Sequence, residues 1–291
     1  MGKLIRCITS DGAVMASFLD STDIVKKAEE YHKTSAVVTA ALGRLLTATS
    51  MMGNMLKGKN DVITLRINGG GPIGNLTAVA DSNGDVRGYV TNPIVEIPLK
   101  KSGKLDVSTA VGKDGTLFVT KDIGMREPYN GQVQLVSGEI AEDITAYYAL
   151  SEQIPTVCAL GVLINPDLSV NVAGGFILQL LPGYTEEEIS RLEENIKNLP
   201  AVTVMLQNKM TGEEIIKKAL AGFEVEVLYE QETSYKCNCS RARAEKVISS
   251  IGREEIEKII EEQGDAEINC QFCDSKYYFT KEQLEKIANK I

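Results

Sequence analysis

The chain of 291 residues has no tryptophan, a single histidine and an aromatic content of only 5%. The histidine, His32, lies at the charged end of a predicted helix, where we expect it to be a solvated surface residue. It provides no positioned base for the serines of Ser137-Gly-Glu139 or Ser151-Glu152. The sequence therefore argues against a Ser-His-Asp hydrolase, and we expect the protein not to be an enzyme.

A basic stripe is also missing, although the net charge of −9 is unevenly distributed. Residues 1–183 carry 16 basic and 18 acidic side chains, residues 184–235 carry 5 and 11, and residues 236–291 carry 10 and 11. None of these segments offers the cluster of positive charge that contacts with phosphates require. We therefore expect no nucleic-acid partner.

Long apolar runs of the kind found in signal peptides and membrane spans are absent. No apolar core of signal-peptide length separates Met1 from Asp11. The most apolar helical stretch, residues 34–56, is interrupted by Arg44 and is rich in Ala, Thr and Gly, which favours a buried helix over a membrane span. The expected location is the cytoplasm, without membrane attachment.

The glycine run Gly69-Gly-Gly-Pro-Ile-Gly74 lacks the features of a phosphate-binding loop. It has no G-K-[ST] ending, and Pro72 removes one amide donor. A Rossmann fingerprint is likewise missing. We expect this run to be a turn between two strands.

Residues 1–183 are predicted to form an α+β domain with a largely antiparallel sheet. Residues 3–19 alternate in polarity around Ser10-Asp11-Gly12, which indicates a β-hairpin. Hairpins and clustered helices without βαβ alternation are typical of this fold class. Helices are expected at 21–33, 34–56 and 139–151, and further strands at 61–67, 75–81, 85–91, 115–121, 132–137, 156–164 and 169–181.

Residues 184–235 are predicted to be an amphipathic helical linker. Thr185-Glu-Glu-Glu188 and Thr211-Gly-Glu-Glu214 are capping boxes, each followed by apolar residues on one helical face. Helices this short are not stable alone in water, so their apolar stripes must rest on another part of the protein. They are either an ordinary linker docked on the first domain or a cover over a surface that can be exposed.

Residues 236–291 are predicted to be a separate small domain. Helices are expected after Ser240, over 253–263 and after Thr280, with a strand on each side of Cys270-Gln-Phe-Cys273. A domain of this size has little core of its own and needs a metal or a crosslink. A structural zinc ion contributes roughly 10–16 kcal/mol of apparent binding free energy in small zinc-folded peptides, so losing it would unfold such a domain.

The six cysteines are of two kinds. Cys7 and Cys158 stand alone among apolar residues and are expected to be buried and inert. Cys237, Cys239, Cys270 and Cys273 form a C-x-C pair and a C-x-x-C pair separated by 30 residues. Four sulfurs without a neighbouring histidine suit tetrahedral zinc, and the spacing fits iron–sulfur patterns poorly.

The C-x-C pair indicates redox chemistry in addition to metal binding. A disulfide between residues i and i+2 closes a small strained ring, and strained disulfides are the labile, regulatory kind. Several alternatives stay open from the residues themselves. For the cysteines these are two plain disulfides or another soft metal. For the function they are a zinc ribbon that binds a protein partner or nucleic acid, the latter disfavoured by the near-neutral charge of residues 236–291, and a thiol-disulfide oxidoreductase, although the βαβ context of the last is missing.

The cysteine arrangement is accompanied by several further motifs along the chain. They are Gly69-Gly-Gly-Pro-Ile-Gly74, Tyr89-Val-Thr-Asn-Pro93, Gly131-Gln-Val-Gln-Leu-Val-Ser-Gly-Glu139, Ser151-Glu-Gln-Ile-Pro155, Gly174-Gly175 and Leu181-Pro-Gly183. In these motifs and in the order of its cysteines, the chain resembles the heat-shock protein 33 family of redox-regulated holdase chaperones. The resemblance covers nearly the whole chain.

That resemblance implies a switch. The reduced form would hold one zinc ion per chain on Cys237, Cys239, Cys270 and Cys273 and would be inactive. Oxidants would form the disulfides Cys237–Cys239 and Cys270–Cys273, release zinc, and unfold the small domain and the linker. The protein would then dimerise and bind unfolding client proteins without ATP. Reduction would let the clients pass to ATP-dependent foldase chaperones.

Overall fold

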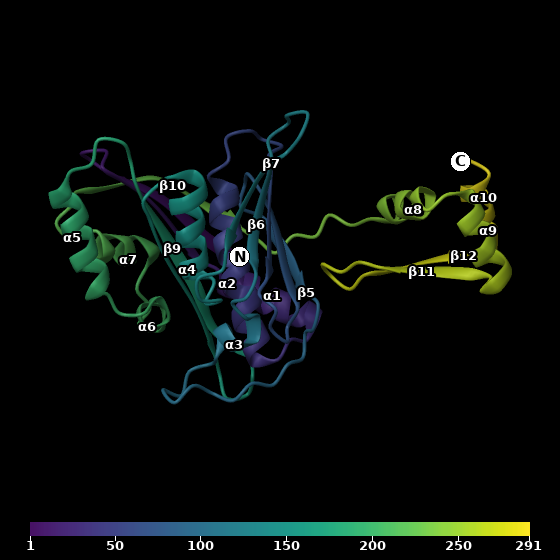
Figure 1. Cartoon of the computed structure of the whole chain (residues 1–291), viewed down its shortest axis with the longest axis horizontal. Helices are drawn as coiled ribbons and strands as arrows, with labels where there is room; N and C mark the ends of the chain where they lie inside the picture. Colours follow the sequence, from purple (N-terminus) through teal and green to yellow (C-terminus); the bar gives the residue numbers. More distant parts are fainter. The chain divides into compact units, whose positions relative to one another are not determined.

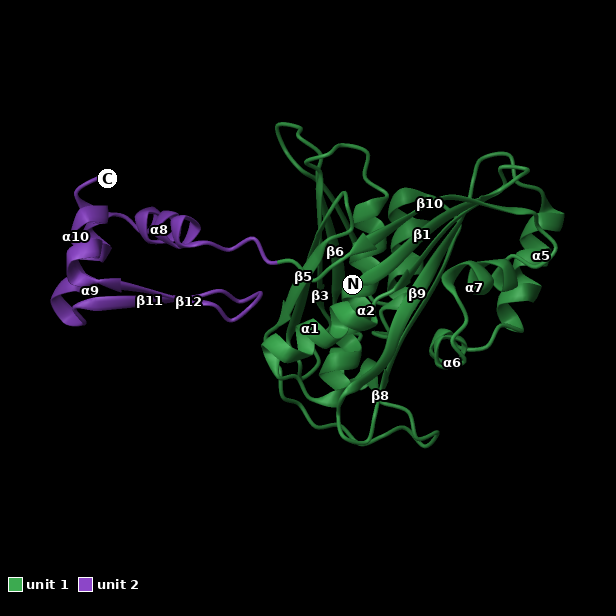
Figure 2. Cartoon of the chain, turned by 180° about the vertical axis from the view of Figure 1, so that it is seen from behind, with its two compact units in different colours: residues 1–236 green, residues 237–291 purple.

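The structure is a computed structural model that describes residues 1–291. It divides into two compact units, Met1–Lys236 and Cys237–Ile291 (Figure 2). Helices and strands are labelled in Figure 1.

The first unit contains a five-stranded antiparallel sheet in the order β10-β1-β2-β9-β8. The hairpin predicted over residues 3–19 forms β1 and β2, and the carboxylate of Asp11 holds its turn by accepting hydrogen bonds from the Thr9 hydroxyl and the Ala13 amide. The strands are β1 (Gly2–Thr9), β2 (Val14–Asp20), β8 (Thr156–Ile164), β9 (Val170–Leu180) and β10 (Val225–Thr233).

A second five-stranded antiparallel sheet has the order β5-β4-β3-β6-β7. The glycine run forms the predicted turn between β3 and β4. The Gly71 amide donates to the Val111 carbonyl and the Ile73 amide to that of Ala110, so these two donors are engaged within the protein and are not free for a phosphate. The strands are β3 (Val62–Asn68), β4 (Asn75–Asp81), β5 (Val86–Val90), β6 (Thr116–Asp122) and β7 (Tyr129–Gln134).

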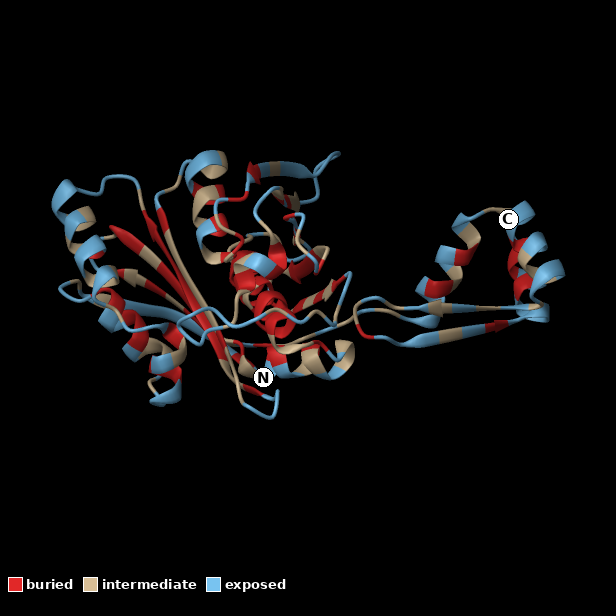
Figure 3. Ribbon diagram, turned by 60° about the horizontal axis from the view of Figure 1, so that its bottom comes forward, coloured by how far each residue is buried: buried red, intermediate tan, exposed pale blue.

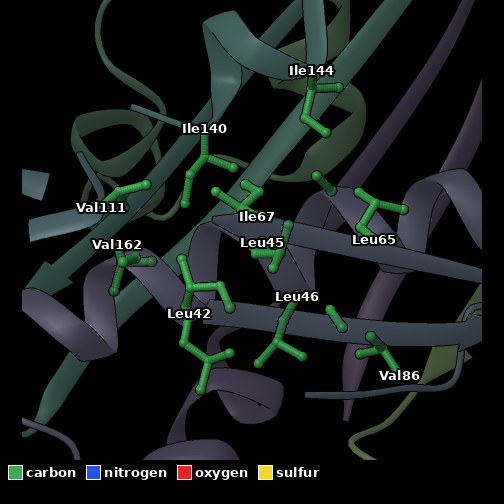
Figure 4. Packing of buried hydrophobic residues seen from close by; sticks show 14 of the residues in the cluster. Leu42, Leu45, Leu46, Leu65, Ile67, Val86, Val111, Ile140, Ile144 and Val162 are labelled. Atoms are coloured by element: carbon green, nitrogen blue, oxygen red, sulfur yellow. The ribbon is translucent and has the colours of Figure 1, made fainter. Parts of the chain in front are cut away.

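Helix α2 (Ala36–Asn54) lies between these two sheets, contacting strands of both. Every residue from Val37 to Asn54 except Arg44 is buried, which places the helix at the centre of the core (Figure 3). Leu42, Leu45 and Leu46 pack among side chains from the surrounding strands and helices (Figure 4). By length and composition α2 alone could cross a membrane, but 89% of its apolar window is buried in the protein, as predicted for 34–56.

The remaining helices of the core pack around α2 and the sheet edges. They are α1 (Thr22–His32), α3 (Val107–Val111), α4 (Ala141–Tyr147) and the π-helical turn η1 (Tyr148–Glu152). The helix predicted over 139–151 is thus present, although its last turn is π-helical. Helix α3 was not predicted. The buried carboxylate of Asp143 accepts hydrogen bonds from four backbone amides, those of Val136, Ser137, Gly138 and Ile140.

Three short helices cover the opposite face of the β1–β2–β9 sheet. They are α5 (Glu186–Lys197), α6 (Val202–Gln207) and α7 (Gly212–Ala219). Both predicted capping boxes form, at Thr185 with Glu188 and at Thr211 with Glu214. The buried residues beneath the helices are contributed by both partners: Ile5, Cys7, Phe18, Phe176 and Leu178 from the sheet, and Leu192, Met205, Ile215, Ile216 and Leu220 from the helical segment. The apolar stripes of the linker rest on the sheet of the first domain, as both alternatives require, and exposure of the surface beneath them stays a prediction.

Strand β10 follows these helices and was not predicted. It pairs with β1 over its whole length, so that Gly2 is opposite Thr233. Residues 184–235 therefore pack as part of the first compact unit, and their behaviour as a separable linker stays a prediction.

The second unit consists of a β-hairpin and three helices. As predicted, the strands β11 (Asp265–Asn269) and β12 (Lys276–Thr280) flank the C-x-x-C pair, and the helices are α8 (Arg241–Ser250), α9 (Arg253–Glu262) and α10 (Lys281–Ala288). Its core is small and consists of Ala244, Ile248, Ile256, Phe279, Leu284, Ile287 and Ala288. A core of this size fits the prediction that the unit needs a metal or a crosslink, and that need stays a prediction.

Candidate metal centre

The C-x-x-C pair lies in the tight turn of the β11–β12 hairpin. The backbone amides of Cys273 and Asp274 both donate to the Cys270 carbonyl, and the Cys270 amide donates to the Ser275 carbonyl. Asp274 adopts the left-handed conformation with φ of 56°, which closes the turn. This geometry brings Cys270 and Cys273 to the same side of the loop.

The C-x-C pair approaches from the segment before α8. Ser240 ends this segment by accepting a hydrogen bond from the Arg243 amide, as expected of an N-cap. The Sγ atoms of Cys237 and Cys270 lie 3.6 Å apart, and those of Cys239 and Cys273 lie 3.4 Å apart. All four Sγ atoms lie within 4.8 Å of one another, so the structure brings together the four cysteines predicted as ligands.

The cluster fits zinc in both chemistry and dimensions. A Zn–S bond of about 2.3 Å places the four sulfurs of a tetrahedral site about 3.8 Å apart, close to the two distances above. Four thiolates are a complete ligand set for a structural site, with no open position for a substrate. No disulfide is present among the four cysteines, which is the state that metal binding requires.

Two of the four sulfurs each have a hydroxyl group within hydrogen-bond distance. The Tyr277 hydroxyl donates to Cys239 Sγ at 3.1 Å, and the Ser275 hydroxyl lies 3.2 Å from Cys273 Sγ. Burial acts to raise the pKa of Cys239, but hydrogen bonds from Tyr277 and from the neighbouring cysteines outweigh it and lower this pKa to about 7. Burial raises the pKa values of Cys237 and Cys270. Of Cys237, Cys239 and Cys270, Cys239 is thus the one that its surroundings favour most strongly as a thiolate.

The two hydroxyl partners were missed by sequence reasoning. Tyr277 follows Cys273 by four residues and lies on β12, so the predicted hairpin offered a way to find it. The identity of its partner depends on how the C-x-C segment folds back over the hairpin. That arrangement has no local sequence pattern.

The lone cysteines do not join the cluster. Cys7 is fully buried, and burial raises its pKa to about 11. Cys158 is half-buried in β8, and burial raises its pKa as well. Both are suited to packing rather than to chemistry.

The prediction for His32 as a solvated surface residue was wrong. Its Nε2 lies 2.9 Å from the Gly88 carbonyl oxygen and 3.2 Å from the Tyr235 hydroxyl. His32 contacts a tyrosine that lies some 200 residues later in the chain. The residues next to His32 in the sequence do not indicate this contact.

The C-x-x-C pair also lacks the setting of a thioredoxin-like enzyme. It lies in a hairpin turn between antiparallel strands, not at the start of a helix in a βαβ unit. The geometry thus favours metal binding over thiol-disulfide exchange with a substrate.

Comparison with known proteins assigns the family. The model of the family described as "Hsp33 protein" matches residues 2–280. The chain belongs to the Hsp33 family. Among the curated Hsp33 relatives, a "33 kDa chaperonin" of Clostridioides difficile (strain 630) is 47% identical over 288 residues, which cover 99% of each chain. The "33 kDa chaperonin" of Bacillus licheniformis is 46% identical over 291 residues and the full length of both chains.

A solved structure supports the same assignment. The crystal structure of the 33 kDa chaperonin, a heat shock protein 33 homolog, from Thermotoga maritima matches with a TM-score of 0.91 and 35% identity. The match covers 99% of this chain and 98% of the other. The resemblance seen in the sequence motifs is therefore confirmed, as is the α+β fold with a four-cysteine cluster near its C-terminus.

Proposed function

We propose that this Hsp33 chain is a redox-regulated, ATP-independent holdase whose reduced form holds one zinc ion and is inactive. The observation that carries the proposal is the convergence of four cysteine sulfurs within 4.8 Å, in a unit with a small core. Cys237, Cys239, Cys270 and Cys273 would hold the ion as thiolates. A zinc ion bound there would crosslink the small domain and would not take part in catalysis.

Oxidation would remove the ligands from the ion. Two thiolates and two protons react with one peroxide molecule, which forms one S–S bond and two water molecules. We propose the pairs Cys237–Cys239 and Cys270–Cys273, which are neighbours in sequence. In the reduced structure the closest sulfurs belong to different pairs, Cys237 to Cys270 and Cys239 to Cys273. Disulfide mapping by mass spectrometry therefore distinguishes the two pairings.

Loss of the ion would unfold the small domain. The apparent free energy of structural zinc binding is about 10–16 kcal/mol, whereas a whole domain is stable by only about 5–15 kcal/mol. We propose that residues 184–235 then leave the sheet they cover. The uncovered face includes Phe18, Phe176 and Leu178, and such an apolar surface is suited to unfolding client proteins.

The proposal extends to the partners and location. The oxidised chain would form a homodimer, hold clients without ATP and pass them to ATP-dependent foldases after reduction. A cytoplasmic location fits a cysteine cluster that must be kept reduced at rest. The unit of residues 236–291 is nearly neutral, which gives nucleic acid little to bind.

One experiment tests the switch directly. The reduced, zinc-loaded protein is titrated with peroxide at elevated temperature while zinc release, disulfides and suppression of client aggregation are followed together. We expect about one zinc per chain to leave as two disulfides form and protection appears. Retention of zinc, or its release without any gain in protection, would show the cluster to be a structural crosslink only.

A further inference from the structure

The segment that precedes the first zinc ligand is fastened to the edge of the second sheet. After β10, residues 234–236 run parallel to β5, with an isolated bridge between Val86 and Tyr235. The Val86 amide donates to the Ser234 carbonyl at 2.9 Å, and the Lys236 amide donates to the Val86 carbonyl at 2.9 Å. In Figure 2 the first unit accordingly ends beside β5. We call residues 234–236 and their partners the clasp.

Asp85 is the charged centre of the clasp. Its Oδ1 accepts hydrogen bonds from the Ser234 amide at 3.0 Å and the Ser234 hydroxyl at 2.8 Å. Its Oδ2 forms an ion pair with Lys236 Nζ at 2.8 Å. The Asp85 side chain is only 15% exposed whereas that of Lys236 is 62% exposed, so the hydrogen bonds from Ser234 contribute more to the clasp than the ion pair does.

Tyr235 is the second anchor. Its hydroxyl donates to the Gly88 carbonyl at 2.7 Å and accepts from the Gly88 amide at 3.2 Å. His32 Nε2 lies beside the same hydroxyl and carbonyl, and the Tyr31 ring packs against Tyr235 with centroids 5.5 Å apart. A single side chain thus links the chain to β5 and to the end of α1.

These contacts lie between the two parts that the switch must connect. Along the chain, the order is covering helices, then β10, then the clasp, then Cys237. Unfolding that begins at the cysteine cluster has to break the clasp before it reaches β10 and α7. We infer that the clasp, centred on Asp85 and Tyr235, is a barrier that confines unfolding of the small domain to residues after Lys236 and sets how readily the covering helices are released.

This inference rests on the proposed function, since the barrier regulates that switch. It treats Asp85 and Tyr235 as positioning residues that touch neither the metal ligands nor the client surface. The reduced protein should therefore keep its zinc content when the clasp is weakened. What should change is how far unfolding spreads once the small domain has unfolded.

Hydrogen exchange of the full chain tests the barrier. The small domain is unfolded without oxidant by the double substitution Cys270→Ser and Cys273→Ser, and exchange is compared with and without Asp85→Ala. With the clasp intact, we expect the amides of Val86 and Lys236 and those of β10 to stay protected. With Asp85→Ala, their exchange should rise by roughly ten- to a hundredfold, the effect expected for hydrogen bonds to a charged group.

Tyr235→Phe is a second and milder variant that removes only a hydroxyl. Tyr229→Phe is its matched control. Tyr229 lies on β10, and its hydroxyl donates to Asn54 Oδ1, outside the clasp. We expect Tyr235→Phe to speed exchange at Val86 and Lys236 and the control to leave it slow. Loss of protection at these two amides while the clasp is intact would overturn the inference, and so would unchanged protection of β10 in both clasp variants.

The same measurements separate this inference from the proposed switch. The cysteine variants lose two ligands whatever an oxidant does, so they test the clasp even if peroxide fails to release zinc. When the four cysteines are native and the protein is oxidised, either clasp substitution should lower the temperature at which client protection appears. An unchanged temperature despite faster exchange of β10 would overturn the role of the clasp in setting helix release.

Discussion

Weakening the contact between α7 and the sheet should activate the protein without any oxidant. Ile216 is fully buried in α7 against the sheet face that contains Phe18. The helix approaches this face closely, since a Cβ on Gly212 would lie 2.4 Å from Phe18 Cδ1. The side chain of Ile216 therefore contributes directly to keeping the helix docked.

The size of the effect follows from the cavity left behind. An Ile→Ala change at a fully buried position costs about 2–5 kcal/mol. Because each 1.4 kcal/mol or so changes an equilibrium tenfold, a loss of about 3 kcal/mol raises the undocked fraction of α7 roughly a hundredfold. We expect this rise in reduced, zinc-loaded Ile216→Ala, accompanied by partial suppression of client aggregation.

The assay combines amide exchange of α7 with aggregation of a heat-unfolded client protein. Lys218→Ala serves as the control, because Lys218 is exposed on the same helix. Faster exchange of α7 with no client protection would refute the idea that the covered sheet face binds clients. Unchanged exchange of α7 would refute the estimate that the Ile216 side chain contributes about 3 kcal/mol to the docking of this helix.

Three further predictions concern the metal centre and the core. Tyr277→Phe removes the hydroxyl that donates to Cys239 Sγ and should weaken zinc binding about tenfold in competition with a chromophoric chelator, whereas Tyr278→Phe should not. In the folded small domain, hydrogen bonds from Tyr277 and the neighbouring cysteines outweigh burial and lower the pKa of Cys239 to about 7. Loss of zinc should unfold this domain and remove those bonds, so the pKa of Cys239 should return to its higher ordinary value and its thiolate should be lost at pH 7. Mapping of iodoacetamide products of the metal-free reduced protein at pH 7 should therefore show no preference for Cys239 and no labelling of buried Cys7; preferential alkylation of Cys239 would show that the domain stays folded without zinc. Asp143→Ala leaves four backbone amides without their acceptor, two of them in buried hydrogen bonds, and should lower the free energy of unfolding of the first unit by about 3 kcal/mol, measured by urea denaturation.

Local interactions made much of the fold predictable. The hairpin around Asp11 and both capping boxes depend on residues two to four positions apart, and all three form as expected. The cysteine ligands were predictable for the same reason, since a C-x-x-C pair needs only a tight turn. Their convergence across 30 residues was inferred from the chemistry of the donor set.

Long-range pairings were not predictable. Strand β10 alternates Val225, Glu226 and Val227, but its partner is at the other end of the chain. The role of His32 depends on Tyr235, and that of Cys239 on Tyr277. The short helices α3 and α6 have too few residues to show a helical period. For β10, His32 and Cys239 the deciding contact is tertiary, and one sequence holds no local trace of it.

The pairing of β1 with β10 has a consequence for biosynthesis. Because Gly2 is opposite Thr233, β1 leaves the ribosome long before β10 is made and covers its outer edge. Contacts between such distant residues form slowly. The covering helices are made later than most of the sheet they cover. A nascent chain thus passes through a stage in which its own apolar sheet face is bare.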